Sequence, residues 1–348
     1  GEYEWQQWDE IVATVAEYPS LELVLVIYGT PAWARTALAP ESETALPDDL
    51  MAFNEFTSAL ATRFADEVDY YQIWDEPNLR DAWGGLDPRP VDYVALLSTG
   101  YNAVYSADPT ATVIGAALAP TTEQGPHNIN EWDYLAEMYA AGAGEVMDAI
   151  GAKPYGFVSS PEDRDVDLAL LNASRVVRLR EIMVENGDPH KAIWASNWGW
   201  NSLSNDWQGD PSIWGEVDRA TQQAYTTSFL TRAEREWPWM GGAILHHWQP
   251  IAEPDDPVWG FSLIDQNGTP NPLLTVLAER PRREHPSNGY YPADNPHTNY
   301  SGVWTFGDLG ADIGWLDDSR FDFRFSGRDI GIRTRQGDFV AYLYPTVN

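Results

Sequence analysis

The sequence contains no cysteine, and this absence removes several kinds of chemistry at once. Without thiols the chain has no disulfide framework, no thiolate nucleophile and no cysteine-ligated metal. Long apolar runs are missing as well. The longest, LELVLVIY at 21–28, is broken by Glu22 and has the length of a strand, whereas a membrane-spanning helix needs about 20 apolar residues. We therefore predict a soluble globular protein with no membrane insertion.

Basic residues are scarce: 21 Lys and Arg stand against 53 Asp and Glu, for a formal net charge of -32. A negative field of this size repels nucleic acid and anionic membrane surfaces, so we exclude both as partners. The same field suits neutral or cationic ligands. A solvated acidic surface is the simplest interpretation of the charge, and an acidic secreted proteome is the alternative.

The chain begins at Gly1 without Met, runs directly into an amphipathic segment and shows no signal peptide. We expect the native N-terminus to be missing. We predict an extracellular or cell-surface location. No feature of the sequence sets the oligomeric state.

Apolar segments of strand length alternate with segments of helical spacing. The strand-like segments begin at residues 21, 68, 111, 149, 191 and 241, and the helix-like segments cover 5–18, 48–66, 131–147, 166–186, 220–236 and 271–279. Such repeated units indicate a parallel sheet covered on both faces. A closed (β/α)₈ barrel of the TIM type has eight strands, so we predict such a barrel with its first strands absent from this chain. An open six-stranded sheet is the alternative.

The pattern changes after residue 280, which ends the predicted barrel domain (1–280). Residues 281–301 are rich in Pro, Asn and Gly and predict a linker. From 302 to 348 apolar residues alternate with period two, as at Phe321, Phe323 and Phe325. This alternation predicts antiparallel strands of a partial, β-sandwich-like module.

The strongest chemical signal is WDEPN, residues 74–78, at the end of a predicted strand. Catalytic groups of parallel barrels lie at the carboxyl ends of the strands. A carboxyl group placed there among apolar and aromatic residues can have its pKa raised by desolvation and serve as a general acid. The alternative is an acidic turn after a strand. The 17 Trp and 17 Tyr residues would supply flat rings that stack on sugars, or core side chains.

IWDEPN resembles the IWNEPN motif of clan A glycoside hydrolases, particularly family 39-like enzymes. The similarity extends to GEYEWQQWDEIV, YGTPAWA, KPYGF and IWASNWGW, and covers roughly residues 1 to 280. It implies a barrel that acts on a β-linked glycan. By this resemblance Glu76 is the acid/base candidate and Trp33 is an aromatic on the substrate side.

Three positions depart from the family pattern. Asp75 stands where the family has Asn, Lys153 where it has His, and Asn197 where it has the nucleophilic Glu. An amide cannot form a glycosyl ester, so we expect the usual retaining double displacement to be unavailable. Lys153 is one of only two lysines, and we infer that it compensates the charge of Asp75. Independent drift in a dead site is the alternative, and the sequence does not show whether Asn197 is natural or engineered.

An inverting route would need another carboxylate as base. Asp75 is one candidate, and loop acids that are otherwise solvated are the others: Asp206, Asp210, Glu253, Asp255 and Asp256. The last three could alternatively bind Ca²⁺, but we predict no metal and no cofactor, since no phosphate-binding glycine loop follows a strand. His246 and His247 are adjacent on a predicted strand, so we expect them to point to opposite faces.

We predict a cleft lined by Trp33, Asp75, Glu76, Asn78, Lys153, Tyr155, Asn197, Trp198, Trp200, His247 and Trp248. Its ligand would be a neutral or amino-bearing oligo- or polysaccharide. Two functional hypotheses follow. One is a glycosidase with Glu76 as general acid and a base, or a nucleophile supplied by the substrate, in place of the lost carboxylate. The other is a catalytically inactive barrel that binds glycan or serves as a cell-surface structural unit.

Overall fold

The computed structural model describes residues 3–18, 20–280, 291–293, 295, 297–307, 310–313, 319–323, 325 and 330–334. The chain divides into two compact units, Gly1–Ala278 and Glu279–Pro345. Most of the predicted linker, residues 281–290, and the end of the predicted C-terminal module, residues 335–348, lie outside the described residues.

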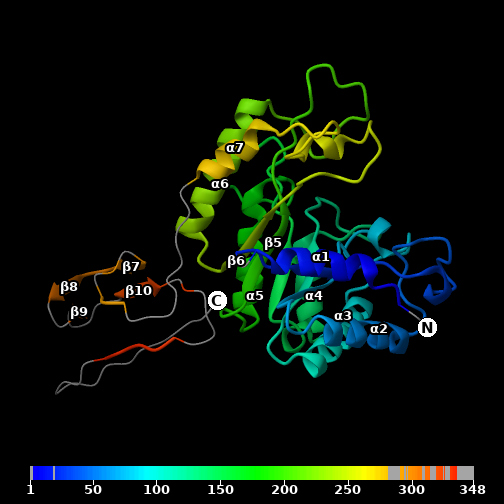
Figure 1. The fold of residues 1–348 in the computed structure, drawn as a ribbon, viewed down its shortest axis with the longest axis horizontal. Helices are drawn as coiled ribbons and strands as arrows, with labels where there is room; N and C mark the ends of the chain where they lie inside the picture. Colours follow the sequence, from blue (N-terminus) through cyan, green and yellow to red (C-terminus); the bar gives the residue numbers. More distant parts are fainter. Residues whose placement is uncertain are drawn as a thin grey trace. The chain divides into compact units, whose positions relative to one another are not determined.

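The first unit is built on one parallel sheet whose strands follow each other in chain order (Figure 1). The strands are β1 (Val24–Ile27), β2 (Tyr70–Asp75), β3 (Thr112–Leu118), β4 (Ala149–Ala152), β5 (Ala192–Trp198) and β6 (Met240–Leu245). A doubly wound sheet reverses its strand order at a switch point, and this sheet does not. The sheet curls into part of a barrel, which brings the side chains of Gln72 on β2 and Ser196 on β5 within 2.6 Å of each other. The predicted partial (β/α)₈ barrel is confirmed.

Helices connect the successive strands. They are α1 (Gln6–Ala16), α2 (Leu50–Arg63), α3 (Pro90–Ala107), α4 (Glu131–Ala140), α5 (Val176–Glu185), α6 (Arg219–Glu236) and α7 (Pro272–Glu279). Short 3₁₀ helices cover Ala32–Ala34, Asp81–Trp83, Ala143–Glu145, Ala173–Arg175 and Pro257–Phe261. Several α-helices begin at a side-chain cap: Asp49, Asn130 and Asp218 each accept a hydrogen bond from a backbone N–H of the first turn.

Two helices differ from the sequence prediction. α3 was not predicted, although Pro90 suits its first turn and Tyr93, Leu97 and Val104 are buried. The helix predicted for 166–186 begins only at Val176. The backbone before it is irregular because carbonyl groups of the 167–170 segment turn toward the guanidinium of Arg175 instead of bonding along a helix.

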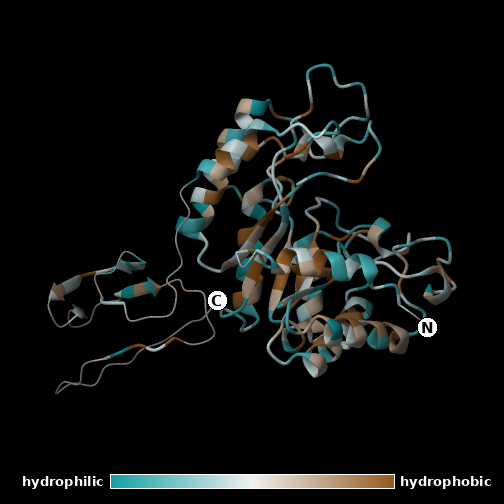
Figure 2. Cartoon of the chain, viewed as in Figure 1, coloured by the Kyte–Doolittle hydropathy of each residue, from teal (hydrophilic) through white to brown (hydrophobic). Residues whose placement is uncertain are grey.

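The core lies where the strands and the inner faces of the helices meet, and there the hydrophobic residues gather (Figure 2). Strands β3 and β4 are almost entirely buried, as central parallel strands are. The edge strands differ. β6 has no fully buried residue, and Val26 of β1 is half exposed. Within the described residues, β1 and β6 each have a strand neighbour on one side only, as expected of a barrel that lacks strands.

The second unit contains two antiparallel pairs. β7 (Thr298–Ser301) pairs with β10 (Arg320–Phe323), and β8 (Trp304–Gly307) pairs with β9 (Gly310–Ile313). The predicted antiparallel strands are therefore present in the described part of this module. Among the described residues of the whole chain, no helix combines the length and the apolar character needed to cross a membrane.

Candidate active site

The end of β2 places two neighbouring carboxylates in one site. Side chains of successive strand residues normally point to opposite faces. Here Trp74 and Glu76 have φ values of 71° and 48°, in the left-handed region that bulky residues rarely adopt. Trp74 is held there by a hydrogen bond from its Nε1 to Ala82 O (3.0 Å), and Glu76 N donates to Ala117 O on β3 (2.9 Å). The strained backbone breaks the alternation, so the side chains of Asp75 and Glu76 share one partner.

That partner is Lys153, which directly follows β4. Its Nζ donates to Asp75 Oδ2 at 2.7 Å and to Glu76 Oε1 at 2.8 Å, and its side chain is only 7% exposed. Burial by itself would lower the pKa of Lys153, but the attraction of Asp75 and Glu76 outweighs burial and raises the pKa above its usual value. Lys153 therefore remains an ammonium at neutral pH and neutralises one of the two negative charges.

Asp75 is also held from its other side. Gln72 Nε2 lies 3.4 Å from Asp75 Oδ1, and Gln72 is fixed in turn by Ser196, whose Oγ donates to Gln72 Oε1. Burial raises the pKa of Asp75, and the charge of Lys153 opposes this rise. Both oxygens of Asp75 thus have partners within the protein. Among the described residues no contact holds Oε2 of Glu76, so Glu76 is the carboxylate with an oxygen free for a ligand.

The ends of β5 and β6 form a neutral side of the site. Asn197 Nδ2 lies 3.0 Å from Nδ1 of His246. An amide nitrogen only donates, so Nδ1 accepts and the imidazole proton lies on Nε2. Burial, followed by the charges of His247 and Lys153, lowers the pKa of His246 to about 3. His246 is therefore uncharged at neutral pH.

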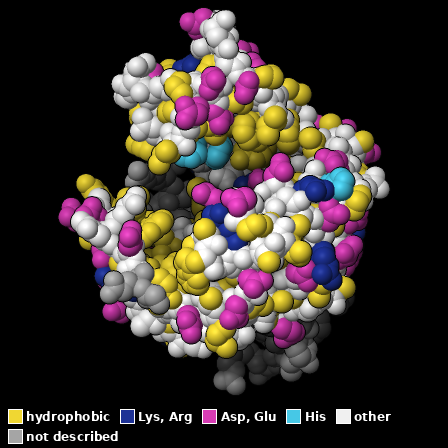
Figure 3. Space-filling view, turned by 90° about the vertical axis from the view of Figure 1, so that its right-hand side faces the viewer, with side chains coloured by type: hydrophobic (Ala, Val, Ile, Leu, Met, Phe, Trp, Pro, Cys, Tyr) yellow, Lys and Arg dark blue, Asp and Glu magenta, His cyan; other side chains and the backbone are white. Residues whose placement is uncertain are grey.

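The two histidines do not point to opposite faces, so that expectation is wrong. β6 ends at Leu245, so the strand alternation no longer applies to them. Their ring centroids lie 4.8 Å apart. In the space-filling view, histidine side chains and a mixed group of acidic and basic side chains border a hollow in the surface (Figure 3). The charges that act on Tyr28, Tyr155 and His246 include those of Asp75, Glu76, Lys153 and His247.

The aromatic residues predicted for the cleft fall into two groups. Trp33 and Trp248 follow the edge strands β1 and β6 and are 76% and 60% exposed, and His247 is half buried. Trp198 and Trp200 are fully buried, and Tyr155 is nearly so. The Trp198 ring stacks on Phe229 at 4.2 Å, and Trp200 Nε1 donates to Ser159 O. Trp198 and Trp200 therefore support the wall of the site from within the core.

Asn78 also lies in the core and not on the open side of the site. Its Nδ2 donates to Ala119 O and Ile129 O, both at 2.9 Å, and its Oδ1 accepts from Ala119 N at 3.0 Å. Asn78 joins the loop after β2 to the loop after β3. The three hydrogen bonds satisfy its amide fully, so it fixes the turn that carries Glu76.

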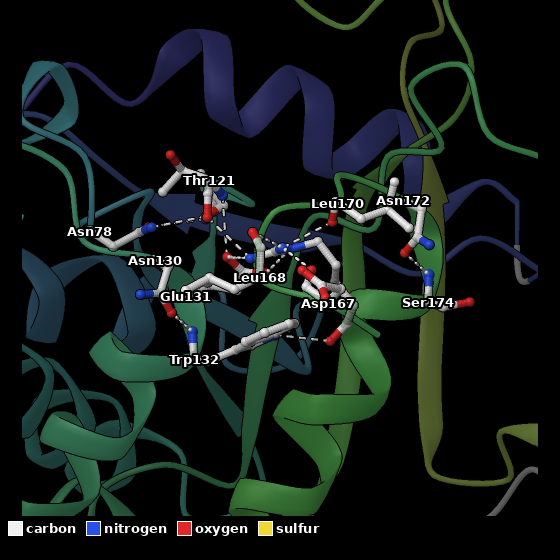
Figure 4. Close-up of polar contacts among 12 residues, drawn as sticks. Asn78, Thr121, Asn130, Glu131, Trp132, Asp167, Leu168, Leu170, Asn172 and Ser174 are labelled. Carbon is white, nitrogen blue, oxygen red and sulfur yellow. Dashed lines mark hydrogen bonds and ion pairs between the residues drawn. The ribbon is translucent and has the colours of Figure 1, made fainter. Parts of the chain in front are cut away.

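A buried ion pair extends this connection to the loop after β4 (Figure 4). Arg175 and Glu131 are each 2% exposed, and Arg175 Nε lies 2.5 Å from Glu131 Oε1. Arg175 also lies over the ring of Trp132 at 4.2 Å. Its remaining N–H groups donate to carbonyl oxygens of Thr121, Asp167, Leu168 and Leu170. The sequence analysis missed this pair, because nothing in the sequence relates residues 44 positions apart.

The loop acids considered as bases lie in solvated loops. Asp206, Asp210, Glu253 and Asp255 are exposed, and Asp256 caps the 3₁₀ helix Pro257–Phe261. Within the described ranges, no ion pair or side-chain hydrogen bond connects any of them to Glu76. The described residues also contain no group of three or more His, Cys, Asp or Glu side chains that could hold a metal ion.

Comparisons with known proteins identify the fold. No protein family model and no curated protein matches the sequence. Among solved structures, a family 39 glycoside hydrolase from Bacteroides cellulosilyticus WH2 is similar with a TM-score of 0.58 and 20% identity over 80% of this chain and 55% of that one. A β-xylosidase from Caulobacter crescentus is similar with a TM-score of 0.51 and 16% identity, over 79% of this chain and 55% of that one.

A glycoside hydrolase of another family is also similar. The GH53 catalytic domain of Ignisphaera aggregans has a TM-score of 0.54 and 15% identity over 78% of this chain and 77% of that one. This chain spans about half the length of the first two structures. It has the fold of clan A glycoside hydrolases, which family 39 enzymes share.

Proposed function

We propose that this barrel acts on β-linked glycans and that Glu76 is the general acid. The observation that carries the proposal is the arrangement of the strand ends. Among the described residues, nothing holds Oε2 of Glu76, and the exposed rings of Trp33 and Trp248 follow the edge strands of the same sheet. Exposed tryptophan rings suit the apolar faces of sugars. Similar structures named as a family 39 glycoside hydrolase and a β-xylosidase support this class of ligand.

In this proposal Glu76 protonates the glycosidic oxygen as the bond to the sugar carbon breaks. A positioned general acid contributes about 10²- to 10⁴-fold to such a rate. The amide of Asn197 cannot form a glycosyl ester. The nucleophile is therefore water or a group of the substrate itself, and the protein supplies the acid and the positioning.

Binding without hydrolysis is the second candidate, and the position of Lys153 favours it. Lys153 donates a hydrogen bond to Glu76 at 2.8 Å and to Asp75 at 2.7 Å. In this arrangement Glu76 accepts a hydrogen bond on one oxygen, whereas a general acid must donate one. A barrel that only recognises glycan would keep the exposed tryptophans and would not need a free acid.

Hydrolysis of a panel of β-linked glycans separates the two candidates. The panel is given to the parent, to Glu76→Gln and Asn197→Glu variants, and to a control, Glu137→Gln, on the exposed face of α4. The proposal predicts cleavage by the parent and by the control, with a loss of at least about 100-fold in Glu76→Gln. The anomer of the first product then distinguishes inversion from retention.

Other outcomes contradict the proposed catalysis in different ways. Activity that appears only in Asn197→Glu would describe a hydrolase scaffold that lacks its nucleophile. If neither the parent nor any variant cleaves the panel, and calorimetry detects glycan binding, the protein is a barrel that binds glycan without hydrolysis. Cleavage that survives Glu76→Gln unchanged would remove Glu76 from the mechanism.

A further inference from the structure

The amide of Asn197 keeps unused hydrogen-bonding capacity at the end of β5. One N–H of its Nδ2 is directed to Nδ1 of His246. Among the described residues nothing donates to Oδ1 of Asn197, and the second N–H of the amide has no acceptor. Both of these groups are available to a ligand. Together they form a donor and an acceptor on one planar amide.

The surroundings of this amide are neutral and apolar. The ring of His246, which is uncharged at neutral pH, lies 5.9 Å from Tyr155 and 5.1 Å from Phe261, measured between centroids. Trp214 adds a further ring, 5.2 Å from Phe261. Asp75 and Glu76 belong to the charged side of the site, where Lys153 donates to one oxygen of each. The side that carries Asn197 offers neutral hydrogen bonds beside aromatic rings.

Asn197 and Glu76 border the same interior. The His246 ring that Asn197 contacts lies 5.9 Å from the ring of Tyr155, two residues after Lys153, whose Nζ donates to Glu76. If Glu76 donates a proton to the oxygen on the anomeric carbon of a sugar, the nearest ring substituent is the one on the adjacent carbon, C2. That substituent is the part of the sugar placed to meet Asn197.

We propose that the ligand carries an acetamido group at C2 of the ring beside Asn197, so that the substrate class is a β-linked glycan that contains N-acetylhexosamine. The amide N–H of the sugar donates to Asn197 Oδ1, and the methyl group of the trans acetamide lies on the same side as this N–H. Its methyl group packs against the aromatic rings around His246. A hydroxyl group at C2 could make the polar contacts but has no methyl group to bury. This inference rests on the proposed glycan binding at the strand ends.

Titration calorimetry with a matched pair of disaccharides tests the inference. N,N′-diacetylchitobiose and cellobiose share the β-1,4 linkage and differ only at C2. We expect the parent to bind diacetylchitobiose at least about tenfold more tightly than cellobiose. The Asn197→Ala variant should reduce this ratio severalfold, because the acetamide loses the hydrogen bond that places its methyl group on the rings, whereas Asn102→Ala, an exposed amide on α3, should retain it.

The ligand comparison in the parent needs no variant, so it stands even if Asn197→Ala does not fold. Equal binding of the two disaccharides, or tighter binding of cellobiose, would overturn the acetamido group while leaving the proposed glycan binding intact. The same holds if Asn197→Ala folds and keeps the full preference. Binding of neither disaccharide, nor of any other β-linked glycan of the panel, would contradict the proposed function itself.

Discussion

The charged and neutral sides of the site differ in how many of their hydrogen-bonding groups already have partners within the protein. On the charged side, at β2 and β4, Lys153 donates to Asp75 and Glu76, and among the described residues Oε2 of Glu76 has no partner. On the neutral side, at β5 and β6, the pair of Asn197 and His246 keeps free donors and acceptors. The charged side is thus held together mainly by its own ion pairs, and the neutral side is where most of the capacity for ligand recognition remains.

Removal of Lys153, on the charged side, should lower the free energy of unfolding more than any change on the neutral side. In Lys153→Met the carboxylates of Asp75 and Glu76 remain side by side without a counter-charge. Loss of one partner from a buried ion pair costs about 3 to 5 kcal/mol, and we expect about 3 because both carboxylates are partly exposed. Urea denaturation at pH 7 measures the change in the free energy of unfolding.

The chain offers a matched control in its other lysine. Lys191 lies 2.9 Å from Asp188 and, among the described residues, contacts no second carboxylate, so Lys191→Met leaves no two adjacent carboxylates to repel each other and should cost less than Lys153→Met. Addition of Asp75→Asn to Lys153→Met should restore part of the lost stability, because it removes one of the two repelling charges. Equal losses at the two lysines, or no recovery in the double variant, would show that Lys153 does not balance this pair.

On the neutral side, we expect His246 to make a smaller, pH-dependent contribution to the free energy of unfolding. The pKa of His246 falls from 6.5 to about 3 on folding, so between these values the unfolded chain binds a proton that the folded protein does not. The contribution is complete above about pH 6.5 and is lost as the pH falls toward 3. Between pH 6.5 and 5 we expect the free energy of unfolding to fall by about 1 kcal/mol through this residue.

Urea titrations across this pH range compare the parent with His246→Gln and with His190→Gln, an exposed control. The parent and the control should show the same slope of stability against pH, and His246→Gln should show a shallower one. The pKa of Glu236 is lowered to about 2 by Arg164 and Arg232, so its contribution to stability is fully present above about pH 4.5 and does not change within this window. An unchanged slope in His246→Gln would mean that His246 is not held neutral.

The sequence predicted all six strands of the barrel because each is a short apolar run bounded by turn residues, and period alone identifies such runs. The helix α3 was missed although Pro90 and the spacing of its buried residues could have identified it. The late start of α5 was not accessible in this way, because it depends on contacts of Arg175 with a distant loop and with Glu131.

The candidate site, too, was predicted from the sequence only in part. The positions of Asp75, Glu76, Lys153 and Asn197 at strand ends follow from the strands themselves. The alternation of side chains along a strand predicts that Asp75 and Glu76 point to opposite faces. Their shared contact with Lys153 depends on the positive φ values of Trp74 and Glu76, which the alternation does not predict. Asn78, Trp198 and Trp200 are polar or aromatic residues at strand ends, so their sequence positions resemble those of ligand contacts, yet their side chains are used inside the fold.

A crystal structure of the protein with bound N,N′-diacetylchitobiose tests the central claim most directly. The account predicts a sugar ring between the two sides, with the glycosidic oxygen within about 3 Å of the Glu76 carboxylate and the C2 substituent on Asn197. A disaccharide bound away from the strand ends, with Glu76 and Asn197 both uncontacted, would contradict it.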